Sequence, residues 1–395
     1  MQIPFRTRVL KSYGADDLSL PELLKYNANP FHCGWLELPL DLPLPAEPHL
    51  SIWKSYREEA EQTSVFAVLK RYFIQFQFPI LSGISSEVSY RAAVSQGVWP
   101  QEGRWPQGLM LEQPEVLKLL IHPSLAGEIP VLIAPHRRDF VSLVQALTRY
   151  NEPTTVPNSM GACMVAGFNN WDRIWRMHHA WCELPGENET WKQVWHQILP
   201  HKELYQDCFI LLSEGSYSGI PAEALDLQPE DWLATSATIR LEHECTHYFT
   251  RRLFGSMRNN LFDEFLADYM GILSVSGRYR ANWFLQFVGL AEFPAYRLGG
   301  RLENYRGKPS LSDPAFAILQ ALVFDAAHNL EYIEDHDRHT RKLPAFEKLL
   351  ALSLLTIEEL ASQEAFRRFE QALSRVANCR QLKPKIDLHF APHGE

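Results

Sequence analysis

The alternation of apolar and polar positions divides the chain into a mixed first half and a helical second half. Two short, continuous apolar runs, 129–134 and 208–212, are typical of buried strands. Helical spacing of apolar residues predicts helices over 50–78, 139–150, 229–254, 260–275 and 313–334, and over 344–377 in one or two pieces. The pattern indicates an α+β protein, with a weak boundary near residue 205.

Prolines and glycines mark the ends of several predicted elements. Pro229 stands where proline suits the first turn of a helix, and Gly255 can adopt the left-handed conformation that ends one. The proline-rich stretch 38–48 lacks the amide hydrogens needed for a helix or a central strand. We therefore expect it to be an extended arm or linker.

Composition and charge exclude several classes of protein. The 395 residues are 46% hydrophobic and 22% charged, which is typical of a globular chain with one large or two coupled domains. The net charge of −9 and the absence of any Lys/Arg run longer than a pair argue against nucleic acid as a partner. No apolar stretch approaches the roughly 18 residues of a membrane span, so we expect a soluble, cytoplasmic protein with no membrane partner.

The strongest chemical signal is the H-E-x-x-H sequence from His243 to His247, inside the predicted helix 229–254. At about 100° per residue, the two histidines lie about 40° apart, so both imidazoles can reach one metal ion. Glu244 projects beside them, where a carboxylate can hold a metal-bound water without being a ligand itself. Cys245 projects to the opposite side, and we expect it to pack in the core and not to bind as a fourth ligand.

A catalytic zinc site needs a third protein ligand, and Glu264 on the next predicted helix is the natural candidate. Asp268 lies one turn further on, where it can accept a hydrogen bond from the outer N–H of a ligating histidine. Ala267 and Gly271 share this face, and their small size allows the two helices to approach closely. We therefore predict one Zn²⁺ ion held by His243, His247 and Glu264.

The motif His243-Glu244-x-x-His247 followed by Glu264-x-x-x-Asp268 resembles that of the gluzincins, a group of zinc metallopeptidases. The resemblance covers about 30 residues. It implies a zincin-like core, with the three zinc ligands above, Glu244 as general base and acid, and Asp268 as a supporting carboxylate. One departure is Asp263, where thermolysin and the alanyl-type aminopeptidases, which belong to this group, carry asparagine. We accordingly divide the chain into 1–205, of unknown role, and 206–395, a mainly helical catalytic region.

Peptide hydrolysis also needs a donor for the carbonyl oxygen that becomes negatively charged. Tyr217, in the glycine-containing loop after the run 208–212, and His328, in the predicted helix 313–334, are the two candidates. In zincins the strand before this loop would be the edge strand that pairs with an extended substrate.

The leading hypothesis is a zinc hydrolase that cleaves an amide bond in a peptide or modified peptide. One alternative is a zinc amide hydrolase or tailoring enzyme that acts on a small metabolite. Another is a metal-stabilised binding protein without turnover, against which the intact Glu244 counts. The substrate, the endo or exo mode of cleavage and the oligomeric state are not predicted.

Overall fold

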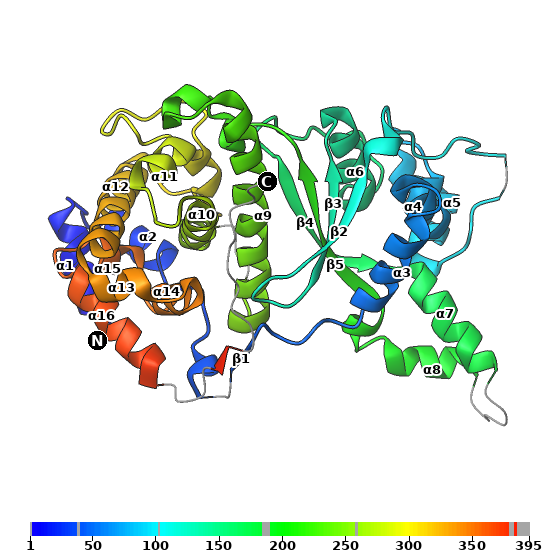
Figure 1. Cartoon of the computed structure of the whole chain (residues 1–395), viewed down its shortest axis with the longest axis horizontal. Helices are drawn as coiled ribbons and strands as arrows, with labels where there is room; N and C mark the ends of the chain where they lie inside the picture. The colour runs from blue at the N-terminus through cyan, green and yellow to red at the C-terminus, as the bar shows by residue number, and fades with distance from the viewer. Residues whose placement is uncertain are drawn as a thin grey trace. The chain divides into compact units, whose positions relative to one another are not determined.

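The computed structural model describes residues 2–37, 40–101, 103–183, 190–256, 260–378 and 383–384. The chain forms two compact units (Figure 1). Unit 1 consists of Met1–Leu44 together with Gly215–Glu395, and unit 2 is the continuous segment Pro45–Glu214. The proline-rich stretch 38–48 contains the junction between them, as expected of a linker.

Unit 2 is built on a four-stranded mixed sheet. Its strands are β2 (Lys118–His122), β3 (Ile129–Ala134), β4 (Ala162–Asn169) and β5 (Gln206–Ser213), in the order β2-β3-β5-β4. β3 and β5 run parallel, with Leu132 opposite Leu211, and both outer pairs are antiparallel. The two strands predicted from apolar runs, β3 and β5, are therefore confirmed as the inner strands of this sheet.

β5 has a neighbour on each side, so the expectation that it is an edge strand is wrong. The strand that takes the edge position beside it is β4, whose sequence ACMVAGFN is rich in small residues and lacks a clear alternation. The register of β4 shifts between Ala166 and Phe168, where Gly167 has a φ of +80°. This irregularity explains why the pattern of apolar and polar residues in β4 does not predict a strand.

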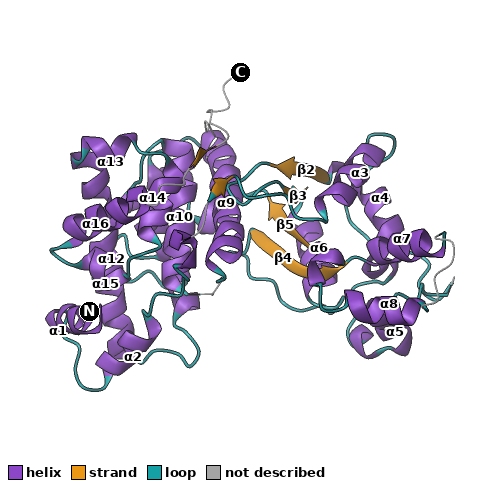
Figure 2. Cartoon of the chain, turned by 90° about the horizontal axis from the view of Figure 1, so that it is seen from below, coloured by secondary structure: helices purple, strands orange, loops and turns teal. Residues whose placement is uncertain are grey.

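Helices cover the sheet of unit 2 (Figure 2). Instead of one helical stretch over 50–78, the chain forms α3 (Leu50–Ala60) and α4 (Val65–Tyr72), and Ser64 caps α4 by accepting a hydrogen bond from the Ala67 amide. α3, α4 and α6 (Arg137–Thr148) share one hydrophobic core with the strands. The remaining helices of this unit are α5 (Val88–Gln96), α7 (Trp171–Cys182) and α8 (Trp191–Ile198).

Asp207, at the start of β5, is the centre of a buried polar network in unit 2. Its carboxylate accepts hydrogen bonds from Trp53 (2.8 Å), Asn170 (2.7 Å) and Arg173 (2.6 Å). His49, just before α3, is also buried and interacts electrostatically with Asp207. The network ties α3 and α7 to β5.

Two long helices form the centre of unit 1: α9 (Pro229–Phe254) and α10 (Leu261–Ser276). Gly255 ends α9 with a φ of +65°, and Asn260 caps α10. Gly271 allows α10 to lie close to α9, because a Cβ atom at this position would be 2.8 Å from the carbonyl oxygen of Ile239. The predicted helices, the glycine stop and the close approach are all confirmed.

Further helices of this unit are α11 (Ala281–Val288), α12 (Asp313–His336), α13 (Arg338–Lys342), α14 (Ala345–Leu352), α15 (Ile357–Ala361) and α16 (Ala365–Asn378). The stretch predicted as one or two helices over 344–377 is thus three. Thr356, the residue directly before the second of them, forms a capping box with Glu359.

The N-terminal residues pack into unit 1, which differs from the predicted division at residue 205. Helix α1 (Gln2–Ser12) carries Arg6, whose guanidinium makes a buried ion pair with Glu358 at 3.0 Å. Helix α2 (Ser19–Tyr26) packs against α12. Contacts between residues more than 300 positions apart leave no local sequence signal, so the pattern of apolar positions did not reveal them.

None of the helices in the described part of the chain combines the length and the hydrophobicity needed to cross a bilayer.

Candidate metal centre

Two neighbouring helices of unit 1 bring His243, His247 and Glu264 together as a group that could hold a metal ion. The two Nε2 atoms of the histidines, both on α9, lie 3.1 Å apart. The carboxylate of Glu264, on α10, lies 3.4 Å from Nε2 of His243 and 3.5 Å from Nε2 of His247. All three side chains are buried. Donors bound tetrahedrally to zinc at about 2.0–2.1 Å are about 3.3 Å apart, so these spacings fit one such ion.

A carboxylate lies behind each histidine. Nδ1 of His243 is 2.9 Å from Oδ1 of Asp268, the residue predicted for this position. Nδ1 of His247 is 3.4 Å from Oδ2 of Asp263, the residue at which the chain departs from the gluzincin pattern. The sequence signal that could have indicated this contact is the position of Asp263 directly before Glu264. Both aspartates are completely buried.

Tyr217 lies behind the candidate ligands, on the short helix η6 (Tyr217–Gly219). Its hydroxyl donates to Oδ1 of Asp268 at 2.6 Å and lies 2.9 Å from Nδ1 of His243. The candidate ligand atom of that imidazole, Nε2, is on the opposite side of the ring. This placement corrects the expectation that Tyr217 stabilises a substrate carbonyl oxygen, because its hydroxyl contacts the carboxylate behind a candidate ligand instead.

His328, the other candidate donor, is an exposed residue of α12. Its ring contacts Phe324, one turn earlier on the same helix, with the ring centroids 4.5 Å apart. The candidate ligands, in contrast, are buried between α9 and α10. The expectation that His328 belongs to the site is therefore corrected as well.

Two further residues of the site come from the short helix η8 (Arg301–Tyr305). The guanidinium of Arg301 donates to Asp268 and, at 2.7 Å, to the hydroxyl of Tyr217. The hydroxyl of Tyr305 donates to Glu264 at 2.8 Å. Tyr26 of α2 in turn donates to the carbonyl oxygen of Tyr305. Sequence reasoning missed these residues because they lie outside any motif and far along the chain.

Glu244 is partly exposed, unlike its neighbours on α9 that face the metal position. Burial raises the pKa of its carboxyl group, and the positive charges of His243 and His247 act in the opposite direction. Glu244 is therefore close to the imidazoles without being part of the ligand group, as the sequence predicts.

The centre of the cluster favours positive charge. Burial lowers the pKa of His243 and His247, but the surrounding carboxylates outweigh it, so both values are raised. Burial would raise the pKa of Glu264, yet the histidines hold it well below its usual range. When His243 and His247 are neutral, four carboxylates face two guanidinium groups, and two negative charges remain uncompensated. The carboxylates are those of Glu244, Asp263, Glu264 and Asp268, and the guanidinium groups are those of Arg240 and Arg301. A divalent cation would balance this excess.

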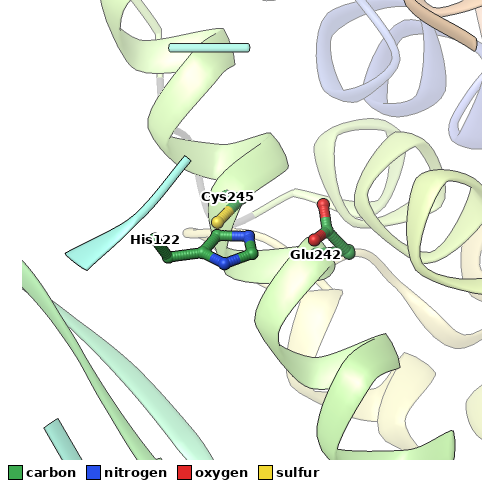
Figure 3. A group of neighbouring side chains, drawn as sticks. All are labelled: His122, Glu242 and Cys245. Carbon is green, nitrogen blue, oxygen red and sulfur yellow. The ribbon is translucent and has the colours of Figure 1, made fainter. Parts of the chain in front are cut away.

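Cys245 and Glu242 project from α9 (Figure 3), the helix that also carries His243 and His247. Cys245 is buried, and burial raises the pKa of its thiol well above the usual range. It does not belong to the His243–His247–Glu264 group. Its burial agrees with the predicted packing role.

Comparison with known proteins identifies the chain only at the level of a family. Residues 8–364 match a family described as a family of unknown function (DUF7005), and the chain belongs to it. No curated protein and no solved structure matches the chain. The function has to be argued from the site.

Proposed function

We propose that this member of a family of unknown function is a zinc-dependent hydrolase that cleaves an amide bond in a peptide or modified peptide. The observation that carries the proposal is the mutual spacing of three buried donors, 3.1–3.5 Å, with Glu244 beside them. The resemblance of the motif to that of the gluzincins supports the same activity.

The donor set fits a catalytic ion better than a structural one. Structural zinc sites are closed by four protein ligands, whereas catalytic sites use three and leave one position open. Two imidazoles and one carboxylate form such a set of three. Zinc is favoured over cobalt or manganese by these ligand types and by its availability.

When bound, zinc lowers the pKa of a coordinated water to about 7 and polarises a substrate carbonyl. Glu244 accepts a proton from the attacking water and passes it to the leaving nitrogen. Its raised pKa suits this role, since a general base works best when its pKa is near the working pH. Asp268 and Tyr305 hold His243 and Glu264 in orientation through their hydrogen bonds.

The decisive experiment compares wild type with Glu244→Gln on a diverse peptide library read by mass spectrometry, with metal content measured in each. Glu230→Gln, an exposed change at the start of the same helix, is the matched control. We expect wild type and the control to cut the same bonds, and Glu244→Gln to bind equal metal but cut about 10²–10⁴ times more slowly.

Two results would contradict the proposal. Equal cleavage by wild type and Glu244→Gln would show that Glu244 is not the general base. Metal-loaded wild type that cuts no peptide would place the small-metabolite amide hydrolase ahead of the peptidase.

A further inference from the structure

We infer that Asp263 is a positioning residue that orients His247 and strengthens metal binding, in parallel with Asp268 behind His243. This inference rests on the metal site of the proposed function. It goes beyond that proposal because it assigns a role to a residue at which the chain departs from the gluzincin pattern.

Two buried polar atoms, one from His247 and one from Asp263, face each other. Nδ1 of His247 and Oδ2 of Asp263 are 3.4 Å apart. Neither atom has a hydrogen-bond partner within the part of the chain that the structure describes. A buried polar group without a partner is costly, so each atom is the natural partner of the other. A small movement of the ring would complete the bond.

The carboxylate of Asp263 is also held in place from its other side. Oδ1 of Asp263 accepts a hydrogen bond from the hydroxyl of Thr250 at 3.1 Å, and the same hydroxyl lies 3.1 Å from the carbonyl oxygen of His247. The backbone amide of Asp263 donates to Asn260 at 3.1 Å. Thr250 therefore holds the carboxylate of Asp263 and Asn260 holds its backbone, so that Oδ2 faces the imidazole.

The chemistry of a ligating histidine favours a carboxylate at this position. An imidazole that binds a metal through Nε2 carries its proton on Nδ1, and an acceptor at Nδ1 fixes the tautomer and makes Nε2 a stronger donor. An asparagine oxygen can accept this hydrogen bond, but a carboxylate also adds a negative charge near the ion. A site with Asp263 behind His247 should therefore bind a cation more tightly than a site with asparagine at the same position.

A competing explanation is that Asp263 stabilises the N-terminal end of α10, where it is in the first turn. That role would affect the stability of the metal-free protein and leave metal affinity unchanged. The two roles are therefore separated by measuring metal affinity and metal-free stability on the same variants.

The test uses the full chain, freed of metal, and measures Zn²⁺ affinity by competition with a chromophoric chelator. We expect Asp263→Ala to bind Zn²⁺ about 10–100 times more weakly than wild type. Asp263→Asn should fall between the two, since it keeps an acceptor but loses the charge. The control is Asp231→Asn, an exposed change on α9, which should match wild type.

A second measurement covers the case in which Asp263→Ala does not fold. Thr250→Val removes the hydroxyl that holds Asp263 and retains the side-chain shape, so it should also weaken Zn²⁺ binding, but by less. The absorption spectrum of the Co²⁺-loaded proteins reports whether the coordination changes with the affinity.

Affinities of Asp263→Ala and Asp263→Asn within about two-fold of wild type would overturn the inference and leave the proposed function standing. A wild-type protein that binds no divalent ion would overturn both. An altered stability of the metal-free variants with unchanged affinity would assign Asp263 to the helix end alone.

Discussion

The hydroxyl of Tyr217 donates a 2.6 Å hydrogen bond to Asp268, the carboxylate that also faces Nδ1 of His243. The three residues come from η6, α10 and α9, so this contact joins three elements of unit 1 at the back of the candidate metal centre. Arg301 contacts both the hydroxyl and the carboxylate and compensates the buried charge. The tyrosine is thus part of the support of a ligand.

Tyr217→Phe should therefore lower stability and metal affinity without a specific effect on the chemical step. Removal of the hydroxyl leaves buried partners of the network unsatisfied, which costs about 1–3 kcal/mol of unfolding free energy. Urea unfolding and Zn²⁺ competition measure the two effects. Tyr332→Phe, at an exposed position of α12, is the control. A variant with wild-type stability and affinity but a much lower cleavage rate would restore Tyr217 as a donor to the substrate.

His328→Ala should leave stability, Zn²⁺ affinity and any cleavage rate unchanged. The side chain is exposed, and exposed substitutions away from special features change stability by less than about 0.5 kcal/mol. Thermal unfolding and the peptide-library assay check this expectation. Loss of cleavage with normal metal content would show that His328 reaches the substrate.

Gly271→Ala should push α10 away from α9 and weaken the metal centre at the same time. The added methyl group would lie 2.8 Å from the carbonyl oxygen of Ile239, which is backbone and cannot rotate away. Such overpacking costs about 1–3 kcal/mol, and the two helices carry the candidate ligands. Gln371→Ala, at an exposed position of α16, is the control for both thermal unfolding and Zn²⁺ competition. Wild-type values for Gly271→Ala would mean that the helices adjust without cost.

A pH-dependent part of the stability should come from His49. Burial lowers its pKa from 6.5, although Asp207 acts in the opposite direction. The unfolded chain therefore binds a proton that the folded protein does not. His49 adds stability above about pH 6.5, and this contribution is lost as the pH falls through the folded-state pKa, by up to about 1.4 kcal/mol per pH unit.

The check is urea unfolding of wild type and His49→Gln at about pH 7.5 and about pH 5.5. The variant should lose less stability than wild type between the two values. His196→Gln, at an exposed position of the same unit, should behave as wild type. An equal pH dependence in wild type and His49→Gln would exclude His49 as the source.

The sequence predicts those parts of the fold and site that depend on local spacing. Helix α9 could be predicted because the apolar period, Pro229 and Gly255 all agree. The group of His243, His247 and Glu264 followed from helical geometry and one return of the chain.

The remainder depends on long-range contacts. Arg301 reaches Asp268 from a short helix 33 residues further on, and Tyr26 approaches Tyr305 from 279 residues earlier. Strand β4 was missed because its small residues and Gly167 hide the alternation. The sequence correctly associated Tyr217 with the site. It could not predict on which side of the His243 ring the tyrosine hydroxyl lies, because that depends on the three-dimensional arrangement of η6, α9 and α10.

Unit 2 is a continuous segment inserted between the two parts of unit 1, and this arrangement fixes an order of assembly during synthesis. Arg6 leaves the ribosome long before its partner Glu358 is made, by tens of seconds at about 5–20 residues per second. Unit 2 can fold in that interval, whereas the first 44 residues must wait for the last helices. A fragment that starts at residue 206 would lack Tyr26 and Arg6, so we expect it to hold the candidate metal centre less stably than the full chain does.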